Sequence, residues 1–277
     1  MADSKRVHIV NGVESDLINI QDRGFQYGDG LFETIAIFNR HPVLLDLHLK
    51  RLSLGLERLH FPNIDLNSLQ ASVNEYSNQF EQAILKLIIT RGVSERGYTP
   101  AVKPEITTVI SITDYRFGKS YSDYIINRLE VCDTRLAENS QLSGIKHLNR
   151  LEQVLAGHEC QQKQYAECLL RDQNDSVVEA LSANVFAWKN NELFTPALDR
   201  CGIQGVMREK IIELAKQLKI PVTVNKMKIE DLENADAVFL TNSVKAIQPV
   251  CALQSIKFDR NNWPTHLFEE VMHHVYS

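Results

Sequence analysis

The chain has 277 residues, of which 44% are hydrophobic and 23% are charged; this composition is typical of a soluble globular protein, and the length allows two domains. Its 30 basic and 35 acidic residues give a formal net charge of −5, which argues against a nucleic-acid-binding function because such proteins carry a basic excess. Five cysteines without a CxxC pair indicate reduced thiols. We find neither a secretory leader nor a membrane span, and therefore expect a cytoplasmic protein.

The first part of the chain alternates between strand and helix patterns. Leucines with helical spacing predict a helix that begins at Asp46 and that Pro62 ends, and a second helix is expected at 66–80. Runs rich in Ile, Val and Thr predict strands at 7–10, 31–38, 41–45, 84–90 and 106–112.

Residues 114–123 have no periodicity, and we expect them to separate a smaller N-terminal domain (1–113) from a larger C-terminal domain (124–277). Segregated strands and helices favour an α+β fold over a doubly wound parallel sheet. The elements expected beyond the boundary are strands at 125–131, 222–224 and 237–240, a hairpin-like stretch at 166–195, and helices at 147–162 and 206–218.

Lys146 is the first candidate catalytic residue. It stands beside the expected start of the helix at 147–162, where the partial positive charge of a helix N-terminus disfavours a cation. That charge, together with burial beside Ile145 and Leu148, would lower the pKa of the amine and favour a nucleophile. From the local pattern alone, a solvated lysine at a helix start is the better explanation.

Glu179 is the second candidate, because it lies between apolar neighbours in a segment that we expect to be half-buried. An unpaired buried carboxylate is costly, so it needs a cationic partner. A protonated pyridine nitrogen would serve, and so would an arginine.

Three stretches could bind a small anion. A glycine before a helix exposes backbone N–H groups that suit phosphate, and hydroxyl, amide and arginine groups add donors. The stretches are His48-Leu-Lys-Arg51, Gly205 with Val206 and Met207, and Thr241-Asn242-Ser243. We find no P-loop, GxGxxG, HExxH or GxSxG motif. Asp29, between two glycines, is interpreted as a turn residue.

In family order, these stretches resemble fold-type IV pyridoxal-phosphate enzymes, a group that includes branched-chain and D-amino-acid transaminases and aminodeoxychorismate lyase. The resemblance covers nearly the whole chain and includes the opening motif Arg23-Gly-Phe-Gln-Tyr-Gly-Asp-Gly-Leu-Phe-Glu33. It implies a two-domain, D-amino-acid aminotransferase-like architecture and a homodimer. It also implies that pyridoxal 5'-phosphate is bound by Lys146 as the Schiff-base lysine, by Glu179 at the pyridine nitrogen, and by Arg51, Val206, Met207, Asn242 and Ser243 at the phosphate.

Within this group, residues 144–156 are most similar to aminodeoxychorismate lyase. The resemblance then implies conversion of 4-amino-4-deoxychorismate to 4-aminobenzoate and pyruvate, a step of folate synthesis. A branched-chain or D-amino-acid transaminase is the alternative, and a catalytically silent relative that binds a cofactor or a partner is a second one. Arg96 is the candidate for the substrate carboxylates, and Tyr27 and Tyr98 are expected to line the pocket. No metal, nucleic acid or membrane is expected as a partner.

Overall fold

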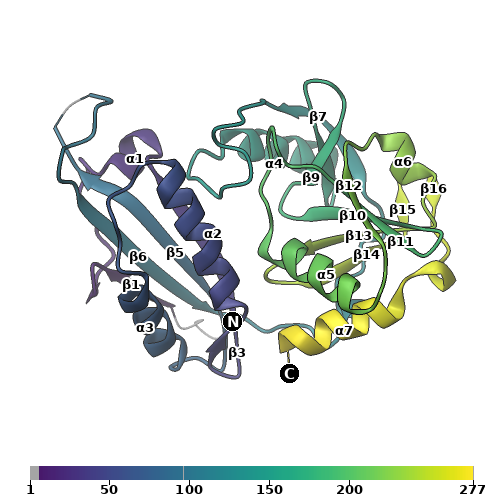
Figure 1. Cartoon of the computed structure of the whole chain (residues 1–277), viewed down its shortest axis with the longest axis horizontal. Coiled ribbons are helices and arrows are strands. Elements are labelled where there is room, and N and C mark those ends of the chain that lie inside the picture. The colour runs from purple at the N-terminus through teal and green to yellow at the C-terminus, as the bar shows by residue number, and fades with distance from the viewer. Residues whose placement is uncertain (1–5, 96, 277) are drawn as a thin grey trace. The chain divides into compact units, whose positions relative to one another are not determined.

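The computed structural model describes residues 6–95 and 97–276, and it divides into two compact units (Figure 1). Unit 1 contains the described residues up to Phe117 together with Ile145–Asn149, and unit 2 contains Gly118–Gly144 and the described residues from Arg150 onward. The division after Phe117 falls inside the segment 114–123. Lys146 belongs to unit 1, whereas the sequence analysis assigned it to the C-terminal domain.

Unit 1 is built on a six-stranded antiparallel sheet with the order β2-β1-β6-β5-β3-β4. Helices α2 and α3 lie beside each other over one face of this sheet (Figure 1). The strands are β1 (Arg6–Val10), β2 (Val13–Glu14), β3 (Gly30–Phe38), β4 (His41–Pro42), β5 (Gln82–Val93) and β6 (Glu105–Asp114), and the helices are α1 (Arg23–Tyr27), α2 (Leu45–Arg58) and α3 (Leu66–Ser77).

The core of unit 1 follows from the two-residue period of its strands. Leu31 of β3 is paired with Ile89 of β5, and both side chains are buried on the same face of the sheet. Helix α2 approaches this face closely, since a Cβ at Gly55 would lie 2.8 Å from a methyl group of Leu31. Glu33 lies two residues further along the same face, and is therefore carried into the apolar layer under α2.

The segment that contains Lys146 extends this sheet at the free edge of β3. The amide of Phe32 donates to the Lys146 carbonyl at 2.9 Å, and the amide of Leu148 donates to the Gly30 carbonyl at 3.0 Å. These bonds hold the segment in unit 1. They also correct the expected helix at 147–162, because the helix begins only at Leu151. A helix N-terminus therefore does not account for the lysine at position 146.

Unit 2 contains a five-stranded sheet with the order β12-β11-β10-β13-β14, a three-stranded sheet with the order β7-β8-β9, and the small pair β15-β16. Its strands are β7 (Glu130–Leu136), β8 (Cys168–Asp172), β9 (Val177–Ala180), β10 (Asn184–Lys189), β11 (Glu192–Pro196), β12 (Val222–Asn225), β13 (Ala237–Asn242), β14 (Ala246–Val250), β15 (Ala252–Leu253) and β16 (Ile256–Lys257). Its helices are α4 (Leu151–Lys163), α5 (Val206–Gln217), α6 (Ile229–Glu233) and α7 (Thr265–Tyr276), with short 3₁₀ turns at Tyr121–Tyr124 and Arg260–Asn262.

The five-stranded sheet of unit 2 is buried on both faces. On one face Phe186 stacks on Phe239 at 5.1 Å between ring centroids, and Phe268 of α7 meets Phe239 edge-on at 5.0 Å. On the other face Val185 and Val238 join a separate apolar cluster. Burial on both faces explains why these strands read as continuous apolar runs.

A second apolar cluster under α4 contains three cysteines whose sulfur atoms lie within 4.8 Å of one another, Cys132, Cys160 and Cys168. Burial raises the pKa of Cys132 to about 12, and burial also raises the pKa of Cys168. Cys132 and Cys168 are therefore protonated thiols that pack with their apolar neighbours. The five cysteines of the chain are free, as the sequence analysis expected.

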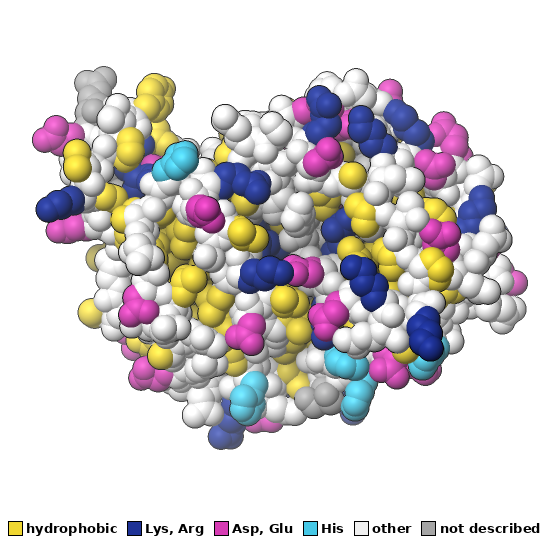
Figure 2. Space-filling view, in the orientation of Figure 1, with side chains coloured by type: hydrophobic (Ala, Val, Ile, Leu, Met, Phe, Trp, Pro, Cys, Tyr) yellow, Lys and Arg dark blue, Asp and Glu magenta, His cyan; other side chains and the backbone are white. Residues whose placement is uncertain are grey.

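The expected α+β class is confirmed, and most strands lie where alternation and β-branched residues predicted them. The strand expected at 125–131 is displaced, because β7 covers Glu130–Leu136, and α2 ends at Arg58, before Pro62. No helix in residues 6–95 and 97–276 is long and apolar enough to cross a membrane. On the face drawn in Figure 2, Lys and Arg side chains are interspersed with Asp and Glu.

Candidate active site

The Lys146 side chain lies on the face of β3 that carries Phe32. Pairing of Leu31 with His147 places Lys146 directly opposite Phe32, and residues opposite each other point to the same face. The Lys146 Nζ atom lies 4.3 Å from the centroid of the Phe32 ring, and the side chain is half-buried. The backbone at Lys146 and Leu148 is thus fixed by hydrogen bonds to β3, and the Lys146 amine lies over the Phe32 ring.

On the opposite face of β3, Glu33 forms a buried cluster with two residues of α2. His48 Nδ1 lies 2.6 Å from one carboxylate oxygen, Arg51 Nε donates to the other at 2.8 Å, and the second Arg51 nitrogen also bonds Glu33. Burial by itself would raise the pKa of Glu33, but the charge of Arg51 and the hydrogen bonds from His48 and Arg51 lower it to about 2. Glu33 is therefore ionised at neutral pH.

His48 is the neutral member of this cluster. Burial lowers its pKa, and the charges of Arg51 and Lys146 act in the same direction, against the opposing effect of Glu33. A neutral imidazole next to a carboxylate donates from Nδ1. Arg51, which the sequence analysis placed in a stretch that could bind an anion, has a side chain only 10% exposed and is oriented by Glu33.

Two glycines of the opening motif are required by close packing around the Lys146 segment. Gly28 ends α1 with φ +66° and accepts a hydrogen bond from Asn149 Nδ2 at 3.1 Å. At Gly30 a Cβ would lie 2.4 Å from the Ile89 carbonyl and 2.7 Å from the Leu148 side chain. The motif therefore serves to bring the lysine segment against β3 and α1.

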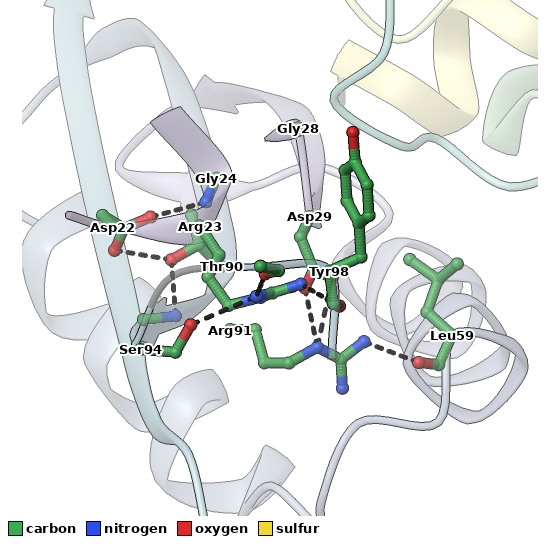
Figure 3. Close-up of polar contacts among 12 residues, drawn as sticks. Asp22, Arg23, Gly24, Gly28, Asp29, Leu59, Thr90, Arg91, Ser94 and Tyr98 are labelled. Carbon is green, nitrogen blue, oxygen red and sulfur yellow. Dashed lines mark hydrogen bonds and ion pairs between the residues drawn. The ribbon is translucent and has the colours of Figure 1, made fainter. Parts of the chain in front are cut away.

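Asp29 joins two arginines that are far apart in sequence (Figure 3). Its carboxylate accepts from Arg23 Nε at 2.8 Å and from Arg91 Nε at 2.9 Å. Burial would raise the pKa of Asp29, but the hydrogen bonds and charges of the two arginines lower it. The interpretation of Asp29 as a turn residue therefore missed its main role, because neither partner arginine was predicted.

The three candidate substrate residues differ in what the structure says of them. The Tyr98 side chain is 86% exposed, and its ring lies 5.5 Å from that of the half-buried Tyr27. Arg96 lies outside the described residues. Tyr27 and Tyr98 are thus brought together in unit 1 as a pair at the end of α1.

In unit 2, Glu179 of β9 is a buried carboxylate, 4% exposed. Its Oε2 atom accepts from the Ile203 amide at 2.9 Å, and its Oε1 atom accepts from Gln153 Nε2 at 3.4 Å. Burial lowers the pKa of Arg150, and the charge of Glu179 opposes that effect. The sequence analysis suggested either an arginine or a protonated pyridine nitrogen as the partner of Glu179. Arg150, in the same unit, is an arginine whose charge interacts with Glu179.

Helix α5 begins without a side-chain cap from its N-cap residue. Its N-cap is Gly205, so the amides of Val206 and Met207 at the first turn have no side-chain acceptor from that residue. A side chain at Gly205 has no room, because a Cβ would lie 1.9 Å from Asn184 Oδ1, and Asn184 is held by the Ile203 carbonyl at 2.9 Å.

Arg208 adds a buried positive charge in the first turn of α5. It is 8% exposed, and it donates to Thr195 Oγ1 at 3.1 Å and to the Pro196 carbonyl at 3.0 Å. Burial alone lowers its pKa to about 10. Within the described part of the chain no carboxylate pairs with this guanidinium, so this end of α5 favours an anion.

The turn between β13 and β14 is held by Asn242. Its side-chain oxygen accepts from the amides of Val244 and Lys245, at 3.0 and 2.8 Å, and its side-chain nitrogen donates to the Ser182 carbonyl at 3.2 Å. The Asn242 side chain is thereby committed to the turn. The neighbouring Ser243 is half-buried.

The sequence matches the family model of class IV amino-transferases over residues 30–253. The chain belongs to this family. It is 33% identical to the aminodeoxychorismate lyase of Vibrio harveyi over 89% of the chain and 91% of that protein. It is 27% identical to a D-alanine aminotransferase of Staphylococcus aureus over 85% of the chain and 83% of that protein.

Among solved structures, the 4-amino-4-deoxychorismate lyase from Pseudomonas aeruginosa is similar to this chain with a TM-score of 0.89. The two are 35% identical, and the similarity covers 96% of this chain and 98% of the other. The resemblance to fold-type IV enzymes is confirmed, and the chain is an enzyme of the class IV family.

Proposed function

We propose that the chain is a pyridoxal 5'-phosphate-dependent lyase that converts 4-amino-4-deoxychorismate to 4-aminobenzoate and pyruvate, a step of folate synthesis. The observation that carries the proposal is full-length similarity to two such lyases, at 33% and 35% identity, against 27% for the D-alanine aminotransferase. A shared fold hosts different reactions, so the proposal rests on this similarity and on the chemistry of the residues.

The groups of unit 2 fit the cofactor. A phosphate suits the uncapped start of α5 and the uncompensated charge of Arg208. A protonated pyridine nitrogen suits a buried carboxylate such as Glu179. In the proposal the phosphate ligands are those assigned from sequence, namely Arg51, Val206, Met207, Asn242 and Ser243, and Asn242 acts through its backbone because its side chain is committed to the turn.

Lys146 is the proposed catalytic residue. When bound, pyridoxal 5'-phosphate supplies an aldehyde that reacts with amines and a pyridinium ring that withdraws electrons. Lys146 Nζ holds the cofactor at rest and acts as the general base that removes the proton from the amine-bearing ring carbon of the substrate. The resulting Lys146 ammonium donates a proton to the ether oxygen as the enolpyruvyl group leaves.

Glu179 holds a proton on the pyridine nitrogen. Its negative charge is kept in place by the Ile203 amide and by Gln153, so it favours the positive ring nitrogen through the whole reaction. No second keto acid takes part, and release of pyruvate leaves an aromatic ring. These two properties separate the proposed lyase from a transaminase.

A transaminase is the competing function, and the D-alanine aminotransferase relative is the observation in its favour. The test is to incubate the cofactor-loaded protein with 4-amino-4-deoxychorismate and to follow pyruvate with lactate dehydrogenase and NADH. Parallel samples contain D-alanine or a branched-chain amino acid with 2-oxoglutarate. We expect pyruvate release without an added acceptor. Amino-group exchange without pyruvate release from 4-amino-4-deoxychorismate would replace the lyase by a transaminase.

The proposed enzyme is a homodimer. In support, α4 carries three large apolar side chains on one face, at helical spacing, that are exposed in the single chain. Leu151 is 77% exposed, Val154 is 63% exposed and Leu155 is 61% exposed. Contiguous exposed apolar side chains of this size mark an interaction surface, and a second copy of the chain would cover it.

A further inference from the structure

We infer that Arg23 is a positioning residue for substrate binding: held by Asp29, it fixes the backbone of Tyr98 so that the Tyr98 ring is presented beside Tyr27. The inference rests on the proposed function and on the expectation from the sequence that these two tyrosines line the substrate pocket. It assigns a role to the first residue of the opening motif, which lies outside the proposed cofactor site.

Each N–H edge of the Arg23 guanidinium has a defined acceptor (Figure 3). Nε donates to Asp29 at 2.8 Å, and Nη2 donates to the Tyr98 carbonyl at 2.7 Å. Nη1 donates to the Gly97 carbonyl at 2.9 Å and to the Ser94 hydroxyl at 3.1 Å. Because Arg23 is only 4% exposed and its donor groups are planar and rigid, the backbone of Gly97 and Tyr98 is fixed by two charge-assisted bonds.

We call Arg23 with its contacts to Ser94, Gly97 and Tyr98 the clamp. Asp29 connects this clamp to the rest of unit 1. It is shared with Arg91, whose guanidinium donates to the Leu59 carbonyl at 2.7 Å and to the His60 carbonyl at 3.0 Å, just after α2. The same guanidinium lies 4.1 Å from the centroid of the Phe61 ring. The position of Tyr98 is therefore set by the end of α2 through two arginines and one carboxylate.

The clamp holds a side chain that is itself exposed. Tyr98 is 86% exposed, so its ring contributes little to the core of unit 1. Its ring is 5.5 Å from the Tyr27 ring, and the Arg23 guanidinium lies 5.0 Å from the Tyr27 centroid. A buried charge network that fixes the backbone of an exposed aromatic residue favours binding, because the entropy of ordering that backbone is lost before the ligand arrives.

The tyrosine pair is tied to the lysine segment within unit 1. Tyr27 is followed by Gly28, whose carbonyl accepts from Asn149 Nδ2 at 3.1 Å, and Asn149 lies three residues after Lys146. A ring-shaped acid with carboxylate, amine and ether groups is a suitable ligand for two phenols, which offer apolar faces and one donor each. The clamp would thus set the affinity for the substrate and leave attachment of the cofactor to Lys146 unchanged.

A positioning residue of this kind is expected to change KM more than kcat, because it contributes binding that is equal in the ground state and the transition state. The experiment compares the cofactor-loaded variants Arg23→Lys, Tyr98→Ala and the double variant. The readouts are KM and kcat for pyruvate release from 4-amino-4-deoxychorismate, and the cofactor absorbance. Arg40→Lys is the matched control, because Arg40 and its partner Glu81 are 61% and 66% exposed.

We expect each single variant to raise KM roughly three- to tenfold, as for loss of one or two ordered side chains, with kcat within about twofold and unchanged cofactor content. The double variant should have a KM close to that of the larger single variant, because Arg23 acts through Tyr98. An unchanged KM in Arg23→Lys, or multiplied effects in the double variant, would overturn the inference.

If Arg23→Lys does not fold, Ser94→Ala replaces it in the comparison of single and double variants. Ser94→Ala removes one contact of the Arg23 guanidinium and leaves Arg23 and Asp29 intact. An unchanged KM in Ser94→Ala would then overturn the inference. A wild-type protein without pyruvate release rejects the proposed function and this inference with it. An active wild type whose variants keep the wild-type KM rejects the inference alone.

Discussion

Glu33 is a residue whose charge is balanced entirely inside unit 1, by Arg51 and by a hydrogen bond from His48. In Glu33→Gln the Arg51 guanidinium loses its buried anion, and we expect a loss of about 3–5 kcal/mol in the free energy of unfolding. Urea denaturation measures this. The control Glu81→Gln, whose ion pair with Arg40 is exposed, should change stability by less than about 1 kcal/mol, and equal effects of the two variants would refute a buried pair.

The same carboxylate makes stability depend on pH. The pKa of Glu33 is lowered from 4.5 to about 2 in the folded chain, so the folded state holds its proton less tightly than the unfolded state. The stabilisation is complete above pH 4.5 and is lost as the pH falls from 4.5 towards 2. The difference in unfolding free energy between wild type and Glu33→Gln should shrink over this range, and a constant difference would contradict the pKa shift.

The proposed role of Glu179 is tested by the substitution Glu179→Gln. In Glu179→Gln the shape of the side chain is kept and the charge that favours a protonated ring nitrogen is lost. We expect retained fold and bound cofactor, with kcat lowered by about 10²–10³-fold, as for other lost electrostatic contacts. Glu167→Gln is the control, a buried carboxylate in the same unit that accepts from the Cys168 and Leu181 amides. A wild-type rate in Glu179→Gln would remove Glu179 from the mechanism.

Single residues also show where sequence reasoning stops. Lys146 and Glu179 could be proposed as site residues because each stands inside a short motif. The Arg23–Asp29–Arg91 cluster was not, because Arg91 is 62 residues from its carboxylate and becomes its neighbour only when β5 pairs with β3. The pairing of Arg51 with Glu33 was not predicted either, because it forms only when α2 packs on β3.

At the scale of elements, the start of α5 gives a steric prediction. In Gly205→Ala the new Cβ would lie 1.9 Å from Asn184 Oδ1, so either the Asn184 side chain or the backbone that carries the Val206 and Met207 amides must shift. We expect at least tenfold weaker binding of pyridoxal 5'-phosphate, about 1.4 kcal/mol, measured by equilibrium absorbance titration of the apoprotein. Gly157→Ala in α4 is the control, because its nearest neighbour would be 3.9 Å away; it should bind normally and gain up to about 1 kcal/mol in stability.

The elements were predictable where periodicity decides them. Strands β3, β5 and β6 and helix α5 followed from apolar runs and helical spacing. The helix after Lys146 was placed too early because Leu148 stands at helical spacing from Leu151 and Leu155. Backbone bonds from β3 hold them in an extended segment instead. Such a tertiary pairing leaves no trace in local periodicity.

At the scale of the whole molecule, the exposed face of α4 predicts association. The wild-type protein should have twice the mass of one chain by light scattering, and Leu151→Glu with Leu155→Glu should shift it towards the mass of one chain, because charges on a buried apolar interface are costly. Leu54→Glu is the control, a leucine of α2 that is 51% exposed. A wild type with the mass of one chain would contradict the dimer.

The sequence analysis expected a boundary in the aperiodic segment at 114–123, and the two compact units divide after Phe117. Composition could not predict that Ile145–Asn149 belong to unit 1. Their place there depends on backbone hydrogen bonds to the edge of β3 beside Gly30. The family and its fold were recognisable because the motifs follow one another in a fixed order along the chain.

The central claim, that Lys146 carries the cofactor, is tested most directly by reducing the cofactor-loaded protein with borohydride and mapping the labelled peptide by mass spectrometry. Lys86 is an internal comparison, because its amine also lies over the Phe32 ring, at 5.1 Å against 4.3 Å for Lys146. We predict pyridoxyl label on Lys146 alone, lost in Lys146→Ala and kept in Lys86→Ala. Label on Lys86 or on any other lysine in the wild-type protein would contradict the account.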